Sequence, residues 1–146
     1  MGTMTADRRA AVLADPGFGR HLTDHLVTAR FAGGTWSALE VEPMHDLVLS
    51  PAAMVLHYGQ AIFEGLKAYR QPDGSLALFR PHDNAARFDR SAARMAMPAL
   101  PDGLFVDAVN AHAMIENSRF ENNASSGVYL KTTVTVVTGS AATGNS

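Results

Sequence analysis

The sequence contains no cysteine and only two lysines among its 146 residues. The absence of cysteine excludes disulfides, thiolate nucleophiles and cysteine metal sites. No apolar run approaches the roughly 20 residues that a membrane-spanning helix requires, and the N-terminus lacks the apolar core of a signal peptide. The formal net charge of −2 provides no overall attraction to nucleic acid. We therefore expect a cytoplasmic protein that binds neither membranes nor nucleic acid.

Local patterns predict an α+β fold in the order helix, four strands, two helices, strand. A helix capped by Thr5 should end at Pro16, and the strands on either side of Gly33-Gly34 should pair as a hairpin. A second hairpin should flank residues 71–74, where proline fixes one φ and glycine supplies a positive one. Consecutive hairpins favour antiparallel pairing, with the helices packed on one face of the sheet.

The two later helices are expected over residues 81–97 and 104–120, followed by a β-branched strand over 128–137. In the first of these helices, Arg87, Arg90 and Arg94 form a basic stripe opposite an apolar one. Such a stripe is often only the solvated face of a helix. The alternative is that one arginine binds an anion, since a guanidinium suits phosphate well. Arg87 is the best candidate, because it lies beside Phe88, which should face the core.

The stretch HYGQAIFEGLKAYR, residues 57–70, holds several residues that could carry chemistry. Glu64 stands in an apolar neighbourhood, where it could act as an acid or base, although a structural role accepting backbone N–H hydrogen bonds is favoured. Tyr58 and Phe63 could line a pocket or pack in the core. Strand alternation puts Lys67 with Tyr69, away from Leu66 and Ala68.

No metal site is predicted from the histidines at positions 21 and 25. On a strand these two residues would share a face but lie about 13 Å apart, which is too far for one ion. Nucleophile-elbow serines and glycine-rich phosphate loops are also missing. Composition and spacing alone therefore name no reaction.

The motifs HYG-x3-FEG and N-x2-R-x3-SA-x-R resemble the N-terminal domain of the branched-chain amino acid aminotransferases, which are fold-type IV enzymes that use pyridoxal 5'-phosphate. The resemblance runs from about residue 15 to residue 105. It implies a small α+β domain over residues 18–137, preceded by an extension, 1–17, and followed by a polar tail, 138–146. It also implies amino transfer between leucine, isoleucine or valine and 2-oxoglutarate, in a homodimer.

The same resemblance implies a role for several residues. Arg87 matches the arginine that binds the cofactor phosphate. The residues that match the substrate pocket are Phe18, Tyr58, Phe63, Tyr129 and Lys131. Lys131 stands where the family has arginine, which keeps the charge but loses the planar fork that recognises carboxylates.

The Schiff-base lysine of the family belongs to a larger domain that follows the small one, and neither Lys67 nor Lys131 occupies its position. We therefore expect a truncated chain without a catalytic residue of its own, which should not transaminate alone. Two alternatives remain open at this point. One is another fold-type IV enzyme, a D-amino acid aminotransferase or an aminodeoxychorismate lyase, and the other is a non-catalytic remnant that serves as a binding module.

Overall fold

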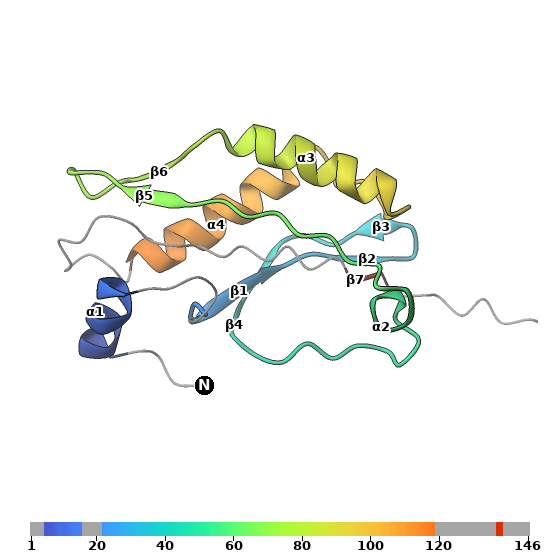
Figure 1. Cartoon of the computed structure of the whole chain (residues 1–146), viewed down its shortest axis with the longest axis horizontal. Coiled ribbons are helices and arrows are strands. Elements are labelled where there is room, and N and C mark those ends of the chain that lie inside the picture. The colour runs from blue at the N-terminus through green and yellow to red at the C-terminus, as the bar shows by residue number, and fades with distance from the viewer. Residues whose placement is uncertain (1–4, 16–21, 119–136, 139–146) are drawn as a thin grey trace, which may run out of the picture.

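The computed structural model describes residues 5–15, 22–118 and 137–138, which form an α+β arrangement of helices and small sheets (Figure 1). The elements are α1 (Ala6–Ala14), β1 (His25–Thr28), β2 (Arg30–Ala32), β3 (Thr35–Trp36), β4 (Glu40–Pro43), α2 (Met54–Tyr58), β5 (Ala68–Arg70), β6 (Leu76–Leu78), α3 (Pro81–Arg94), α4 (Leu104–Ser118) and β7 (Val137–Thr138). In the part described, the four strands β1 to β4 make one long hairpin and α4 lies across it. The hairpin of β5 and β6 and the helix α3 lie on the other side of α4.

The first hairpin is confirmed, and it has a bulge that the sequence patterns did not indicate. Its turn is Gly33-Gly34, and both glycines have positive φ, +58° and +83°, as a tight two-residue hairpin turn requires. Near the turn Phe31 pairs with Trp36, whereas farther out Thr28 pairs with Glu40. Residues 29–30 therefore stand opposite residues 37–39, and this additional residue divides each arm into two short strands.

The second hairpin joins β5 to β6 in antiparallel register, also as predicted. Gly74 has a φ of +83° and donates its backbone N–H to Gln71 O at 3.0 Å. Asp73 accepts hydrogen bonds from the backbone and the hydroxyl of Ser75. This turn chemistry is local, which explains why the sequence alone predicted it.

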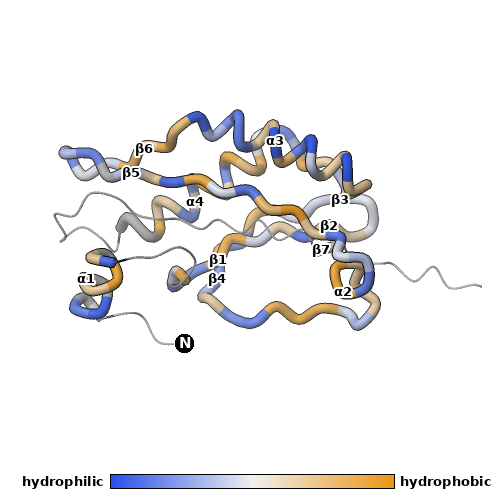
Figure 2. Tube along the Cα trace, viewed as in Figure 1, coloured by the Kyte–Doolittle hydropathy of each residue, from blue (hydrophilic) through white to orange (hydrophobic). Residues whose placement is uncertain are grey.

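The core lies between α3, α4 and the second hairpin. The rings of Phe88 and Phe105 are 5.3 Å apart at their centroids, and Val109 is fully buried beside them. A second cluster joins Ala68 of β5 to Ala113 of α4, and Leu78 packs against both clusters. The apolar stripe predicted for α3 is confirmed at its centre, since Phe88 and Ala92 are each 1% exposed. On the opposite face of α3 hydrophilic residues dominate (Figure 2).

Three features differ from the sequence-based expectation. Residues 54–58 form the short helix α2, which ends at Gly59 with a φ of +59°. The helix predicted over 81–97 ends at Arg94, because the chain turns through Met95 and Ala96, and Ala96 has a positive φ. The strand predicted over 128–137 lies mostly outside the described residues, but Val137 belongs to β7, which pairs with β2 in parallel rather than antiparallel fashion.

Candidate functional site

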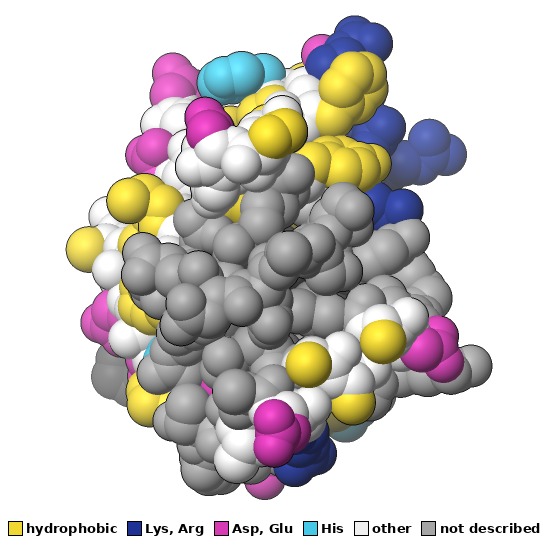
Figure 3. Space-filling model, turned by 90° about the vertical axis from the view of Figure 1, so that its left-hand side faces the viewer, with side chains coloured by type: hydrophobic (Ala, Val, Ile, Leu, Met, Phe, Trp, Pro, Cys, Tyr) yellow, Lys and Arg dark blue, Asp and Glu magenta, His cyan; other side chains and the backbone are white. Residues whose placement is uncertain are grey.

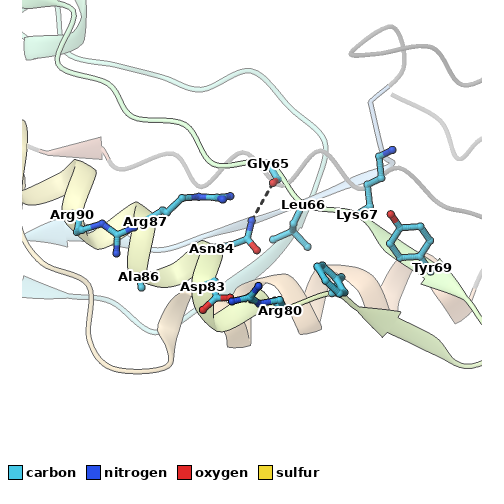
Figure 4. Close-up of a pocket in the computed structure, with 11 residues that line it drawn as sticks. Gly65, Leu66, Lys67, Tyr69, Arg80, Asp83, Asn84, Ala86, Arg87 and Arg90 are labelled. Atoms are coloured by element: carbon cyan, nitrogen blue, oxygen red, sulfur yellow. Dashed lines mark hydrogen bonds and ion pairs between the residues drawn. The ribbon is translucent and has the colours of Figure 1, made fainter.

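An open groove lies where the chain leading into β5 passes over the N-terminal half of α3 (Figure 4). Its volume is about 570 Å³. In Figure 4 Arg90 lies at one end of the groove, and Lys67 and Tyr69 lie at the other. The lining residues come from two segments, Gly65, Leu66, Lys67 and Tyr69 from the first and Phe79, Arg80, Asp83, Asn84, Ala86, Arg87 and Arg90 from the second.

The groove is positively charged. Four cationic side chains line it, those of Lys67, Arg80, Arg87 and Arg90, against the single acid Asp83. Asp83 forms an ion pair with Arg80 one helical turn away. The space-filling view of the end of the molecule nearest the β5–β6 turn shows Lys and Arg side chains gathered along one edge, beside hydrophobic ones (Figure 3). Such a concentration of positive charge in a concave surface attracts anions.

Arg87 is held by a carboxylate that comes from the preceding segment of the chain. Arg87 Nε donates to Glu64 Oε2 at 3.1 Å, and Arg87 Nη2 donates to Glu64 Oε1. The Glu64 side chain is 9% exposed, whereas that of Arg87 is 56% exposed. The bidentate pair thus has its carboxylate inside and its guanidinium facing the groove.

Asn84 of α3 also binds the Glu64 carboxylate. It is 8% exposed, and its Nδ2 amide donates to Glu64 Oε1 at 2.8 Å. The same group donates to Gly65 O at 3.1 Å (Figure 4). Both N–H groups of the amide are therefore used to hold residues 64 and 65 against α3. Asn84 and Arg87 are one helical turn apart, so they reach the same carboxylate from one face of the helix.

The pKa of Glu64 is lowered from its ordinary value of 4.5, chiefly by the hydrogen bond from Arg87, with burial opposing the shift and the Asn84 hydrogen bond supporting it. The same pair raises the pKa of Arg87 further above its ordinary value. Glu64 is therefore a carboxylate at neutral pH. It accepts hydrogen bonds, in line with the structural role favoured from the sequence, but they come mainly from side chains.

Tyr58 and Phe63 lie apart from this groove. Tyr58 is 75% exposed at the end of α2, and Phe63 is 58% exposed. Neither residue lines the groove at Arg87. The Phe63 ring lies over Gly65, where an added Cβ would come within 3.2 Å of its Cζ. Core packing within the described residues therefore does not account for either aromatic.

The other three residues assigned to a substrate pocket, Phe18, Tyr129 and Lys131, lie outside the described residues. In contrast, the expected alternation along β5 is confirmed, because Ala68 is completely buried and Tyr69 is 47% exposed. The structure adds that Lys67 lines the same groove as Arg87.

Sequence reasoning missed Asn84, Arg80 and Arg90 as parts of one site. The N-x2-R spacing of Asn84 and Arg87 was a usable signal, since two polar residues one turn apart share a helix face. No local signal places Glu64 against them. Within the described ranges, no cluster of three or more His, Asp or Glu side chains could hold a metal ion. None of the helices in these ranges combines the length and apolar character needed to cross a bilayer.

Comparison with known proteins gives a consistent family name. The chain is 54% identical over 109 residues to a probable branched-chain-amino-acid aminotransferase of Streptomyces coelicolor, covering 74% of this chain and 30% of that protein. It is 47% identical over 106 residues to a branched-chain-amino-acid aminotransferase of Mycobacterium tuberculosis, covering 72% of this chain and 29% of the relative. With branched-chain-amino-acid transaminase 1 of Bacillus subtilis the identity is 38% over 116 residues, covering 79% and 33%.

The chain thus spans about a third or less of the length of these relatives, and the aligned part is their N-terminal region. No protein-family model matches the sequence. The identities over about seven-tenths of this chain nevertheless agree on one kind of protein. Over the aligned residues, the chain is similar to the N-terminal region of proteins named branched-chain-amino-acid aminotransferases.

Proposed function

We propose that this chain supplies the phosphate-binding arginine and part of the substrate pocket of a branched-chain amino acid aminotransferase. The complete protein would move the amino group of leucine, isoleucine or valine to 2-oxoglutarate, which leaves a branched 2-oxo acid and forms glutamate. It would act as a cytoplasmic homodimer of fold-type IV. The observation that carries the proposal is Arg87, which faces a cationic groove and stands in the N-x2-R motif of a chain that aligns with aminotransferases.

The groove residues fit the phosphate of pyridoxal 5'-phosphate. A phosphate carries two negative charges or nearly so and accepts several hydrogen bonds, so it needs cationic donors in an open concave surface. Arg87 supplies a guanidinium on a side chain that is more than half exposed, and Arg90 and Lys67 add positive charge along the same groove. When bound, the cofactor would supply the electron sink that amino transfer requires.

The contribution of this chain's own residues is binding and orientation. Arg87 would hold the phosphate by charge-assisted hydrogen bonds, and Asn84 and Glu64 would keep the segment before β5 against α3. Lys67 would add charge to the groove. No residue among those described would take part in covalent chemistry.

The aromatics at Tyr58 and Phe63 would accept the branched side chain of the substrate, together with Phe18. Tyr129 would belong to the same pocket, and Lys131 would offer its charge to the substrate carboxylate. The exposure of Tyr58 and Phe63 supports this role, since large aromatic rings that no core contact covers are common at binding surfaces. In a homodimer, Tyr58 would act near the site of the partner subunit.

A chimera tests this function. This chain would replace the matching N-terminal segment of the Streptomyces coelicolor relative, and the purified chimera would be assayed with 2-oxoglutarate against L-leucine and against D-alanine. We expect transamination of leucine with little or no activity towards D-alanine. A folded chimera that uses D-alanine, or that transaminates neither amino acid, would contradict the proposal.

A further inference from the structure

The fork of Arg87 is oriented before any ligand binds. A guanidinium has two edges that can hold an oxyanion in bidentate fashion, one formed by Nε and a terminal nitrogen, the other by the two terminal nitrogens. Glu64 occupies the first edge, through Nε and Nη2. Glu64 does not use the second edge, and the Arg87 side chain is 56% exposed and lines the same groove as Arg90 and Lys67.

Glu64 in turn has little freedom. Its side chain is 9% exposed, and the buried amide of Asn84 binds both Glu64 Oε1 and the carbonyl of the next residue, Gly65. Asn84 is fixed in α3, whose neighbouring Phe88 is packed in the core. A continuous series of contacts therefore runs from the core through the Asn84 amide and the Glu64 carboxylate to the Arg87 guanidinium at the groove.

We infer that Glu64 and Asn84 are positioning residues that hold the guanidinium of Arg87 with its second edge presented to an oxyanion in the groove. A long arginine side chain that is already immobilised loses less conformational entropy when it binds. This inference rests on the proposed function, because the oxyanion it concerns is the phosphate of the cofactor. It assigns a role to the glutamate of the FEG motif and to the asparagine of the N-x2-R motif.

Glu64 is a carboxylate beside a groove that should bind an anion. Two explanations of its role therefore predict opposite changes in anion affinity when the carboxylate is removed. If Glu64 acted only as a competing negative charge, its removal would strengthen anion binding. If Glu64 positions Arg87, its removal weakens binding even though the groove becomes more positive. The groove keeps an excess of cationic side chains in either case, with Lys67, Arg80 and Arg90 still present.

The experiment uses the 146-residue chain and two NMR readouts. The first is the order of the Arg87 Nε–Hε group, assigned by its loss in Arg87→Ala, and the second is a titration with inorganic phosphate. We expect Glu64→Gln and Asn84→Ala each to increase the mobility of Arg87 Nε. Each should also weaken phosphate binding by about tenfold, the loss seen when groups that orient metal ligands are removed.

Glu40→Gln is the matched control, since Glu40 is an exposed acid on β4 that does not line the groove. It should leave both readouts unchanged, and Glu64→Asp, which keeps the charge on a shorter side chain, should recover only part of the order. Phosphate affinity that rises or stays the same in Glu64→Gln would overturn the inference, provided that the dispersed spectrum shows a folded chain. Phosphate binding that Arg87→Ala leaves unchanged would instead defeat the proposed function, while the order of Arg87 would still report on the positioning.

Discussion

Residues 57–63 and 64–69 are adjacent in the chain, but they make different kinds of contact. In the first segment Tyr58 is 75% exposed and Phe63 is 58% exposed. In the second, Ala68 is completely buried and the Glu64 carboxylate is bound by Arg87 and Asn84. The second segment is a fixed platform for the groove, whereas the first presents large rings without a covering core. A single motif thus combines a part that positions an arginine with a part suited to contact something else.

The packing beneath residues 64–69 can be tested at Phe88, which contacts Phe105 in the core cluster against which Leu66 also packs. Phe88→Ala should lower the free energy of unfolding by about 3–5 kcal/mol, because it removes a fully buried ring and leaves a cavity. Urea unfolding measures this loss. The control is Phe79→Ala at a 73% exposed ring, which should change the free energy by no more than about 0.5 kcal/mol. Equal losses in the two variants would contradict the described core.

The role of the exposed rings in residues 57–63 can be tested at Tyr58 and Phe63. In the chimera, Tyr58→Ala and Phe63→Ala should each raise the KM for leucine by about tenfold, the size of a lost apolar contact in a substrate pocket. The free energy of unfolding should change by less than about 0.5 kcal/mol, since both rings are largely exposed. Val48→Ala, at a 91% exposed side chain, serves as the control. A large loss of stability with an unchanged KM would mean that the rings are structural.

The free energy of unfolding should also depend on pH through the ionisation of Glu64. Because the pKa of Glu64 is lowered in the folded chain, its ionised form stabilises the fold above its ordinary pKa of 4.5. This stabilisation is lost as the pH falls through the lower value in the folded protein. The difference in unfolding free energy between the wild type and Glu64→Gln should therefore be largest near neutral pH and shrink below pH 4.5. A difference that stays constant down to acid pH would rule out the ionised pair as its cause.

The smallest expected effect concerns Lys67, which lines the groove without a covalent role. When the 146-residue chain is mixed with pyridoxal 5'-phosphate and reduced with borohydride, peptide mapping should find no stoichiometric adduct on Lys67. A lysine that forms such a bond is commonly desolvated in an apolar pocket, whereas Lys67 is exposed and immediately precedes β5. A full equivalent of adduct there would show that this lysine is more than a source of charge.

The parts of the fold that the sequence predicted depend on local chemistry. Local residues set the backbone at the two turns and at the start of α3, since Gly33, Gly34 and Gly74 permit a positive φ and Pro72 and Pro81 fix φ. The sequence therefore predicted these turns and this helix start. The helix α2 was missed because five residues carry too little periodicity. The bulge in the first hairpin depends on pairing register, which side-chain patterns near the turn do not fix.

The candidate site was only partly predictable for a similar reason. Arg87 could be selected from its place beside Phe88 on a helix, and the family resemblance agreed with that choice. Its contact with Glu64 joins residues that are 23 positions apart, and the groove arises only when the segment before β5 lies on α3. These are tertiary contacts, and no spacing rule in the sequence encodes them.

The central claim is that Arg87 binds the cofactor phosphate, and the dissociation constant of pyridoxal 5'-phosphate in the chimera tests it most directly. Arg87→Ala should weaken binding by about 10- to 100-fold, the value of one or two charge-assisted hydrogen bonds. Arg94→Ala removes the same side chain from the end of the same helix, outside the groove, and should leave the constant unchanged. Equal dissociation constants for the wild type and both variants would contradict the account.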